Sequence, residues 1–128
     1  MIFKKKKVKL LIIDDEKDIC VFEKNYFEKR DFRVSVAQTG ETALKLAAKQ
    51  KPDIALIDVH MAKGMNGMEI LKKLLEIQPG CRCIMATWDK DRAAEAKKMG
   101  AVDYLIKPVQ LQDVDNMINK AVKSLEKK

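Results

Sequence analysis

The sequence predicts an α/β protein built on an open, doubly wound sheet of five parallel strands. Short apolar runs alternate five times with longer segments of helical periodicity, and this alternation implies parallel pairing with right-handed crossovers. The first and third runs, residues 8–13 and 54–57, contain few polar residues, which indicates a sheet covered on both faces. No repeat, low-complexity tract or linker interrupts the pattern, so a single domain is expected.

The first helix is predicted between two strands by its apolar spacing. Residues 8–13 form the first strand, and apolar side chains then recur at helical spacing through residues 16–30. The inward stripe that this spacing predicts comprises Ile19, Phe22 and Tyr26. Residues 32–37 follow as the second strand.

The second and third helices lie on either side of the third strand in the chain. Thr39 begins the second helix, and Pro52 resets the chain before the strand at residues 54–57. The residues of this helix expected to face inward are Ala43, Leu44 and Ala47. The third helix follows a glycine-containing loop at residues 63–67 and ends before Pro79. Its predicted stripe comprises Met68, Leu71 and Leu75.

Two further strand–helix pairs complete the pattern. Residues 83–86 and 103–106 are the predicted fourth and fifth strands. The helix between them is expected over the alanine-rich residues 91–99, with Gly100 at the usual position of a C-terminal cap. The clearest amphipathic stripe belongs to the last helix and comprises Leu111, Val114, Ile118, Ala121 and Leu125.

Composition is typical of a globular protein, with 47% hydrophobic and 35% charged residues. The apolar run near the start stops at Asp14, too early to cross a bilayer, and no signal-peptide cleavage pattern follows it. A cytoplasmic location without membrane insertion is therefore expected. The net charge of +7 comes mainly from lysines scattered along the chain with few aromatic residues among them. This pattern favours a solvated coat or an acidic protein partner over direct nucleic-acid binding.

The three cysteines, Cys20, Cys81 and Cys83, have no disulfide-framework spacing and indicate a reducing compartment. Cys81 and Cys83 would share one face of a strand, as metal ligands can. No second Cys or His cluster completes such a site, so both are interpreted as strand thiols. Cys20 and methionines such as Met68 are interpreted as core filler.

Five polar residues follow the predicted strands at their carboxyl ends. Asp14 and Asp15 follow the first strand, Asp58 the third, Thr87 the fourth and Lys107 the fifth. Because ligands of doubly wound sheets bind at this edge, these side chains are expected to converge there.

Their chemistry is coherent. Three crowded carboxylates repel one another unless a cation joins them, and hard oxygen ligands suit Mg²⁺. An aspartate such as Asp58 can attack a phosphoryl group, and transfer then needs positioning and charge neutralisation, which Lys107 and the metal supply. The Thr87 hydroxyl can donate a hydrogen bond to a phosphoryl oxygen.

At this point the sequence resembles the response-regulator receiver family of two-component signalling. The matching residues are Asp14, Asp15, Asp58, Met61, Gly67, Thr87 and the run from Asp103 to Pro108. The resemblance implies a flavodoxin-like (βα)5 fold with strand order 2-1-3-4-5. It also implies one receiver domain over residues 1–128, with a core of about residues 8–125.

The resemblance assigns roles residue by residue. Asp58 matches the phosphoacceptor, and Lys107 matches the phosphate-pairing lysine, which is followed by a cis peptide bond at Pro108. The residues that match metal ligands are Asp14, Asp15, Asp58 and the backbone carbonyl of His60. Thr87 and Tyr104 match a switch pair, although Tyr104 can also be read as ordinary half-buried strand packing. The resemblance also suggests that the His60 side chain and Asp89 modulate how fast the phosphoryl group is lost. Trp88 is expected either to modulate the site as well or to be a surface aromatic residue with no role.

The implied function is a switch. A histidine kinase or phosphotransfer protein supplies the phosphoryl group to Asp58 with Mg²⁺ as cofactor, and Mn²⁺ is able to replace it. The face made by the fourth helix, fifth strand and fifth helix then changes for a downstream protein target. The chain is not expected to be an enzyme beyond its own phosphotransfer and autodephosphorylation.

Three departures from the family pattern occur. Ala62 stands where proline is usual, and the loop from Asp58 to Gly67 is one residue longer. Trp88 replaces a small residue and could partly cover the acceptor, and the stretch from Thr87 to Lys107 is about two residues short.

Two alternatives to the switch stay open: a degenerate receiver that binds partners without phosphorylation, and the regulatory fragment of a longer transcription factor or enzyme. An aspartyl-phosphate phosphatase is disfavoured, because it would need a second acid where His60 stands. As a loop residue, His60 is also not expected to be a phosphohistidine relay donor.

Overall fold

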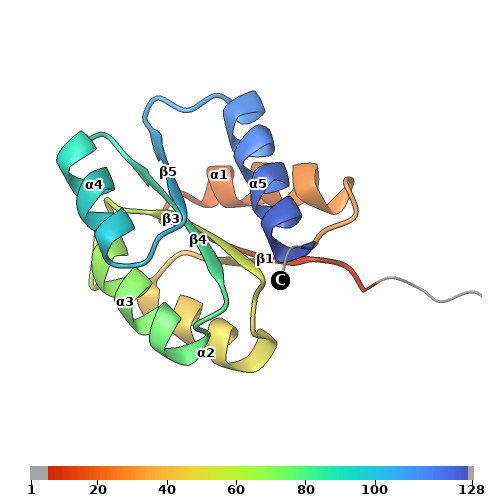
Figure 1. Ribbon diagram of the computed structural model, residues 1–128, viewed down its shortest axis with the longest axis horizontal. Coiled ribbons are helices and arrows are strands. Elements are labelled where there is room, and N and C mark those ends of the chain that lie inside the picture. The colour runs from red at the N-terminus through yellow and green to blue at the C-terminus, as the bar shows by residue number, and fades with distance from the viewer. Residues whose placement is uncertain (1–5, 127–128) are drawn as a thin grey trace, which may run out of the picture.

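Figure 1 shows the computed structural model of the chain, which describes residues 6–126. Strands and helices alternate through the described residues. The strands are β1 (Lys9–Ile13), β2 (Arg33–Ala37), β3 (Ile54–Asp58), β4 (Arg82–Thr87) and β5 (Asp103–Ile106). The helices are α1 (Lys17–Glu28), α2 (Gly40–Gln50), α3 (Gly67–Ile77), α4 (Lys90–Lys98) and α5 (Leu111–Glu126). Each predicted element is present, with ends that differ by a few residues from the predicted ones.

The strands form one parallel sheet in the order β2-β1-β3-β4-β5, which confirms the predicted fold class and strand order. The order reverses between β1 and β3, which are neighbours in the sheet. Their register pairs Ile13 with Ile57, so the residues that follow β1 lie beside the last residue of β3. Ligands of such sheets bind at this reversal point, outside the carboxyl ends of the strands.

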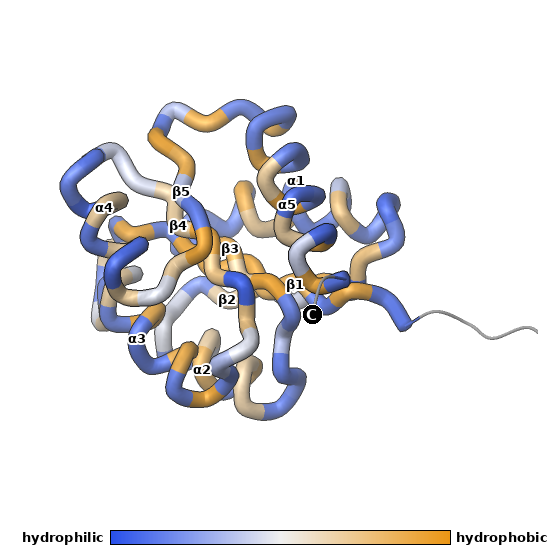
Figure 2. The backbone as a smooth tube through the Cα atoms, viewed as in Figure 1, coloured by the Kyte–Doolittle hydropathy of each residue, from blue (hydrophilic) through white to orange (hydrophobic). Residues whose placement is uncertain are grey.

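Helices cover both faces of the sheet (Figure 1), and the strands between them form the apolar centre of the molecule (Figure 2). Residues from α1 and α5 pack on one face around the fully buried Phe27. Residues from α2, α3 and α4 pack on the other face around Ile57 and Leu71. Each large side chain buried in this way contributes about 1.5–3 kcal/mol of transfer free energy, so these two layers hold the sheet edge that carries the polar residues.

Side chains at the helix N-termini fix where several helices begin. The Thr39 hydroxyl accepts the Thr42 N–H at the start of α2. Asn66 and Glu69 form a reciprocal capping box at the start of α3. The Asp89 carboxylate accepts the Asp91 N–H at the start of α4. These caps satisfy N–H groups that have no partner inside the helix.

The predicted inward stripe of α1 is partly wrong. Phe22 is 58% exposed, whereas Cys20 and Phe27 are the buried residues of this helix. Ile19 and Tyr26 are only partly buried. Helical spacing identifies an apolar face but leaves its rotation about the helix axis open by one position, and here the face that contacts the sheet includes Cys20.

Gly67 lets α3 begin directly against the end of β3. A Cβ atom at this position would lie 2.4 Å from the carbonyl oxygen of Asp58 and 2.5 Å from Cα of Val59. The Gly67 N–H also donates to the carbonyl oxygen of Val59. A side chain here would therefore force α3 away from the strand that ends at Asp58.

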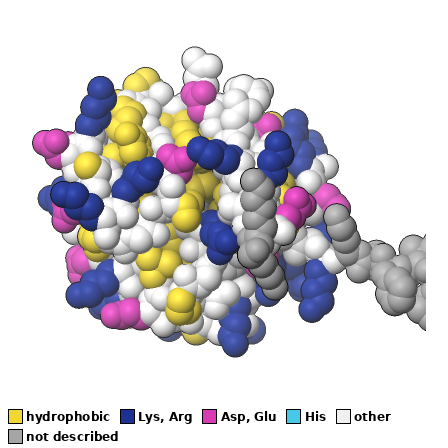
Figure 3. Space-filling view, in the orientation of Figure 1, with side chains coloured by type: hydrophobic (Ala, Val, Ile, Leu, Met, Phe, Trp, Pro, Cys, Tyr) yellow, Lys and Arg dark blue, Asp and Glu magenta, His cyan; other side chains and the backbone are white. Residues whose placement is uncertain are grey.

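The surface and the cysteines agree with the sequence analysis. On the face shown in Figure 3, Lys and Arg side chains are spread among acidic and hydrophobic ones and form no single patch. Cys20, Cys81 and Cys83 are free and buried. Between residues 6 and 126, no helix has the length and apolar character needed to span a membrane.

Candidate functional site

Four strand ends deliver polar side chains to one edge of the sheet. Asp14 and Asp15 follow β1, Asp58 is the last residue of β3, Thr87 is the last residue of β4, and Lys107 follows β5. The Asp14 N–H donates to the carbonyl oxygen of Ala37, which extends the β1–β2 pairing by one residue. The edge on which the sequence placed these residues is therefore the edge on which they lie.

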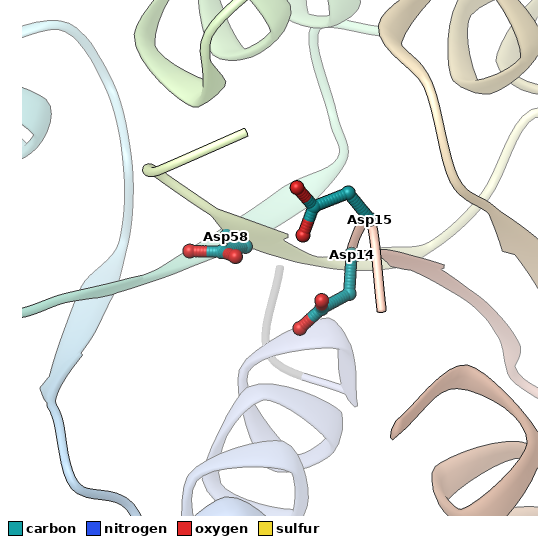
Figure 4. A group of neighbouring side chains, drawn as sticks. All are labelled: Asp14, Asp15 and Asp58. Atoms are coloured by element: carbon teal, nitrogen blue, oxygen red, sulfur yellow. The ribbon is translucent and has the colours of Figure 1, made fainter. Parts of the chain in front are cut away.

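The three acids face one another in Figure 4. One carboxylate oxygen from each of Asp14, Asp15 and Asp58 lies within 4.8 Å of the others. Asp58 is buried, and Asp14 and Asp15 are half-buried. An all-oxygen set of converging carboxylates with open space on one side fits a hard divalent cation such as Mg²⁺, which keeps several water ligands.

Lys107 supplies the positive charge next to Asp58. Its Nζ lies 2.9 Å from Oδ1 of Asp58, and the two side chains are 22% and 6% exposed. The His60 N–H donates to the same oxygen at 3.0 Å. Within the described residues no hydrogen bond occupies Oδ2 of Asp58, so this oxygen is the one available to a reacting group. The Lys107–Pro108 peptide bond is cis, the isomer that the resemblance implies.

Burial and charge raise the pKa of Asp14 to about 6. Burial has the largest effect, and the nearby Asp58 carboxylate adds to it. The hydrogen bond from the Glu16 N–H and the charge of Lys107 lower the pKa and offset part of the rise. The carboxyl group is therefore partly protonated near neutral pH, and a cation in the cluster would favour its ionised form.

Thr87 is completely buried at the end of β4, and its hydroxyl has two partners. Nε2 of His60 lies 2.8 Å from Oγ1 of Thr87, and the Asp89 N–H donates to the same oxygen at 3.1 Å. The His60 side chain thus crosses from the loop after β3 to the end of β4. Asp89 also caps α4, so the start of this helix is tied to Thr87.

Trp88 and Tyr104 lie in different surroundings. Trp88 is 62% exposed, and Nζ of Lys107 lies 5.9 Å from the centre of its ring. Tyr104 is partly buried and packs against the apolar cluster between the sheet and α2, α3 and α4. Trp88 therefore lies beside the acids at the sheet edge. Tyr104 instead packs on the face of the sheet that α2, α3 and α4 cover.

A cavity of about 680 Å³ joins the acids to a gap beside α1. Its lining includes Asp58, Lys107, Trp88, Phe22 and Leu111. Glu23, which the sequence analysis did not single out, also lines it. Burial, with a smaller effect of the Asp14 charge, raises the pKa of Glu23 to about 7. In the sequence, the only feature that distinguishes Glu23 is its position directly after Phe22, in the predicted apolar stripe of α1.

The family model for the response regulator receiver domain matches residues 10–119. The chain belongs to this family. The chemotaxis protein CheY of Listeria monocytogenes serovar 1/2a is 34% identical over 119 residues, which cover 91% of this receiver and 99% of that protein. Sporulation initiation phosphotransferase F of Bacillus subtilis is 32% identical over 114 residues, with coverages of 88% and 91%.

Solved structures and longer relatives agree with this assignment. A response regulator receiver domain protein from Methanospirillum hungatei JF-1 has a TM-score of 0.89 at 27% identity and covers 95% of this receiver and 98% of its own chain. The regulatory protein AtoC of Escherichia coli is 32% identical over 116 residues, but the match covers only 25% of AtoC. The receiver is thus a phosphoacceptor module of two-component signalling, a signalling protein rather than a typical enzyme.

Proposed function

We propose that Asp58 of this receiver accepts a phosphoryl group from a histidine kinase or a phosphotransfer protein. The observation that carries the proposal is the pairing of the buried Asp58 carboxylate with Nζ of Lys107 at 2.9 Å, beside two further acids. Lys107 and the His60 N–H both bind Oδ1, which leaves Oδ2 as the attacking oxygen. Oδ2 bonds to phosphorus as the bond from phosphorus to the donor imidazole nitrogen breaks, and the donor nitrogen takes up a proton.

The cofactor in this proposal is Mg²⁺, with Mn²⁺ able to replace it. Asp14, Asp15, Asp58 and the carbonyl oxygen of His60 would hold the ion, and their all-oxygen chemistry supports this choice. When bound, the ion neutralises phosphoryl oxygens. Lys107 neutralises charge at the Asp58 carboxylate and keeps this carboxylate oriented.

The output in this proposal is the face made by α4, β5 and α5. Thr87 ends β4 and contacts Asp89, the cap of α4, while Tyr104 lies in β5. A hydroxyl that turns toward a phosphoryl group on Asp58 would change both contacts of Thr87. We infer that a downstream protein reads this change, and that His60, Trp88 and Asp89 set how long the phosphoryl group persists.

The extent and location of the switch also belong to the proposal. We regard residues 1–128 as a single receiver domain with a core of about residues 8–125. Its place is the cytoplasm, which the three free cysteines support. Regulation within a longer protein is the alternative supported by the match to one quarter of AtoC.

The experiment is phosphorylation by acetyl phosphate or phosphoramidate, followed by intact-mass measurement. We expect a gain of one phosphoryl group in the presence of Mg²⁺, little with EDTA, and none in Asp58→Asn. Asp53→Asn is the matched control, because Asp53 lies at the other end of β3 and binds the Lys9 N–H. Failure of the wild type to gain mass, with small donors and with kinases, would favour the degenerate receiver.

A further inference from the structure

His60 touches both the proposed phosphoacceptor and the proposed switch residue. Its backbone N–H donates to Oδ1 of Asp58 at 3.0 Å, and Nε2 of its ring lies 2.8 Å from Oγ1 of Thr87. The ring therefore bridges the ends of β3 and β4. Nothing in the general chemistry of phosphoryl transfer requires a side chain in this place, so the contact needs its own explanation.

The neighbouring hydrogen bonds show which group donates. The Trp88 N–H points at Nε2 of His60 at 3.4 Å, and an N–H can only be accepted by a nitrogen that carries no hydrogen. The Asp89 N–H already donates to Oγ1 of Thr87 at 3.1 Å. Both contacts are allowed when Nε2 carries no hydrogen: the Thr87 hydroxyl donates to its single lone pair at 2.8 Å, and the Trp88 N–H shares that lone pair at the longer distance of 3.4 Å. The reverse arrangement would leave the Trp88 N–H facing another N–H.

In this arrangement the single hydroxyl hydrogen of Thr87 is used in the hydrogen bond to His60. A threonine has one O–H to donate, and here His60 receives it. If Thr87 is to donate to a phosphoryl oxygen on Asp58, the bond to His60 must break. After such a turn the phosphoryl oxygen is the new acceptor for the Thr87 hydroxyl, and Nε2 of the exposed His60 loses its donor within the protein.

We propose that the His60 imidazole is a latch that holds Thr87 in its resting orientation and so sets the balance between the resting and the activated receiver. The inference rests on the proposed function, because it assumes that Thr87 turns toward Asp58. An interaction present in only one of two states shifts their ratio by its own free energy. A net hydrogen bond of about 1 kcal/mol corresponds to about a fivefold change in that ratio.

The test measures binding of beryllofluoride, a phosphoryl mimic, by amide NMR in the presence of Mg²⁺. We expect His60→Ala to bind it about fivefold more tightly than the wild type, because the resting state loses its hydrogen bond. His60→Gln keeps an acceptor on the side chain and should return the affinity toward that of the wild type. Equal or weaker binding by His60→Ala would overturn the latch.

A double-mutant cycle separates a latch from a merely structural role. If His60 acts through the Thr87 hydroxyl, its substitution should have no effect on beryllofluoride binding in a Thr87→Ala background. The same gain in that background would contradict the proposal. In the wild type, the ¹⁵N spectrum of the imidazole should show Nε2 without a hydrogen, and a protonated neutral Nε2 would also overturn it.

The two proposals fail in different ways. A wild-type protein that neither gains mass from phosphoryl donors nor binds beryllofluoride would overturn the proposed function and, with it, the latch. A wild type that responds normally, together with variants whose affinities do not change, would overturn the latch alone.

Discussion

The backbone N–H of Ala62 donates to Oδ2 of Asp15, with 2.7 Å between the two atoms. It is a short, charge-assisted hydrogen bond between the loop after β3 and an acid of the proposed metal site. A proline at position 62 has no N–H and could not make this bond. The departure from the family pattern at this residue therefore adds a contact to the site.

We predict that Ala62→Pro weakens Mg²⁺ binding. The lost N–H would leave the Asp15 carboxylate free to turn, and partners that orient metal ligands are worth about tenfold or more in metal affinity. Titration calorimetry with Mg²⁺ measures this directly. Ala62→Ser keeps the N–H and should bind like the wild type. If the proline and serine variants bound Mg²⁺ equally well, the orienting role of the Ala62 N–H would be wrong.

We predict that the metal-free protein loses stability as the pH rises from about 4 to about 7. The pKa of Asp14 rises from 3.8 to about 6 and that of Glu23 from 4.5 to about 7 on folding. In that range these two carboxyl groups hold more protons in the folded state than in the unfolded state, so their titration favours unfolding as the pH rises. Urea unfolding in EDTA at several pH values measures the slope.

Variants can identify which carboxyl groups cause the pH dependence of the free energy of unfolding. Glu23→Gln should flatten its upper part, between about pH 5 and 7, because the group that titrates there is gone. Glu76→Gln, on the exposed side of α3, should leave it unchanged. A slope that persists in both Glu23→Gln and Asp14→Asn would show that other groups cause it.

We predict that Lys107→Met destabilises the metal-free protein by about 2 kcal/mol, because the buried Asp58 carboxylate loses a charged hydrogen-bond partner. Adding Asp58→Asn to Lys107→Met should restore most of this loss, since no unpaired charge is then buried. Lys120→Met is the matched control: its ion pair with Asp103 is 3.4 Å long and the lysine is largely exposed. Chemical denaturation would contradict the prediction if both single variants had the same stability.

We predict that Gly67→Ala destabilises the protein by about 2 kcal/mol or more, because the new Cβ would meet the backbone of Asp58 and Val59. Gly80→Ala is the control, since a Cβ there meets nothing within 4 Å. Its stability should stay within about 0.5 kcal/mol of the wild type. Thermal or urea unfolding compares the two variants. Equal stabilities would mean that α3 can shift without cost.

The fold and the main acids could be predicted because they depend on periodicity alone. Five strand–helix alternations predict the sheet, and the residues that follow parallel strands must share an edge, so the sequence predicts that Asp58 and Lys107 lie close together. The rotation of α1 could not be fixed in the same way. Helical spacing allows two apolar faces for α1, one with Ile19 and Phe22 and one with Cys20 and Phe27. In the structure the second face packs against the sheet.

The loop contacts were beyond prediction for a different reason. Whether the His60 ring turns toward Thr87, and whether the Ala62 N–H meets Asp15, depends on backbone angles of a loop without regular periodicity. The burial of Glu23 likewise follows from how α1 sits beside the cavity. Sequence patterns predict which helix or strand a residue belongs to, whereas these features depend on how a loop or helix is oriented.

Asp14 and Lys107 stand far apart along the chain yet line the same cavity. A polypeptide still on the ribosome can expose every acid of the cluster before β5 has been made, and it would then lack the ammonium group. The same is true of a molecule whose edge strand has frayed from β4. If Lys107 acts as proposed, such incomplete chains would take phosphoryl groups from the donor more slowly than the folded receiver does.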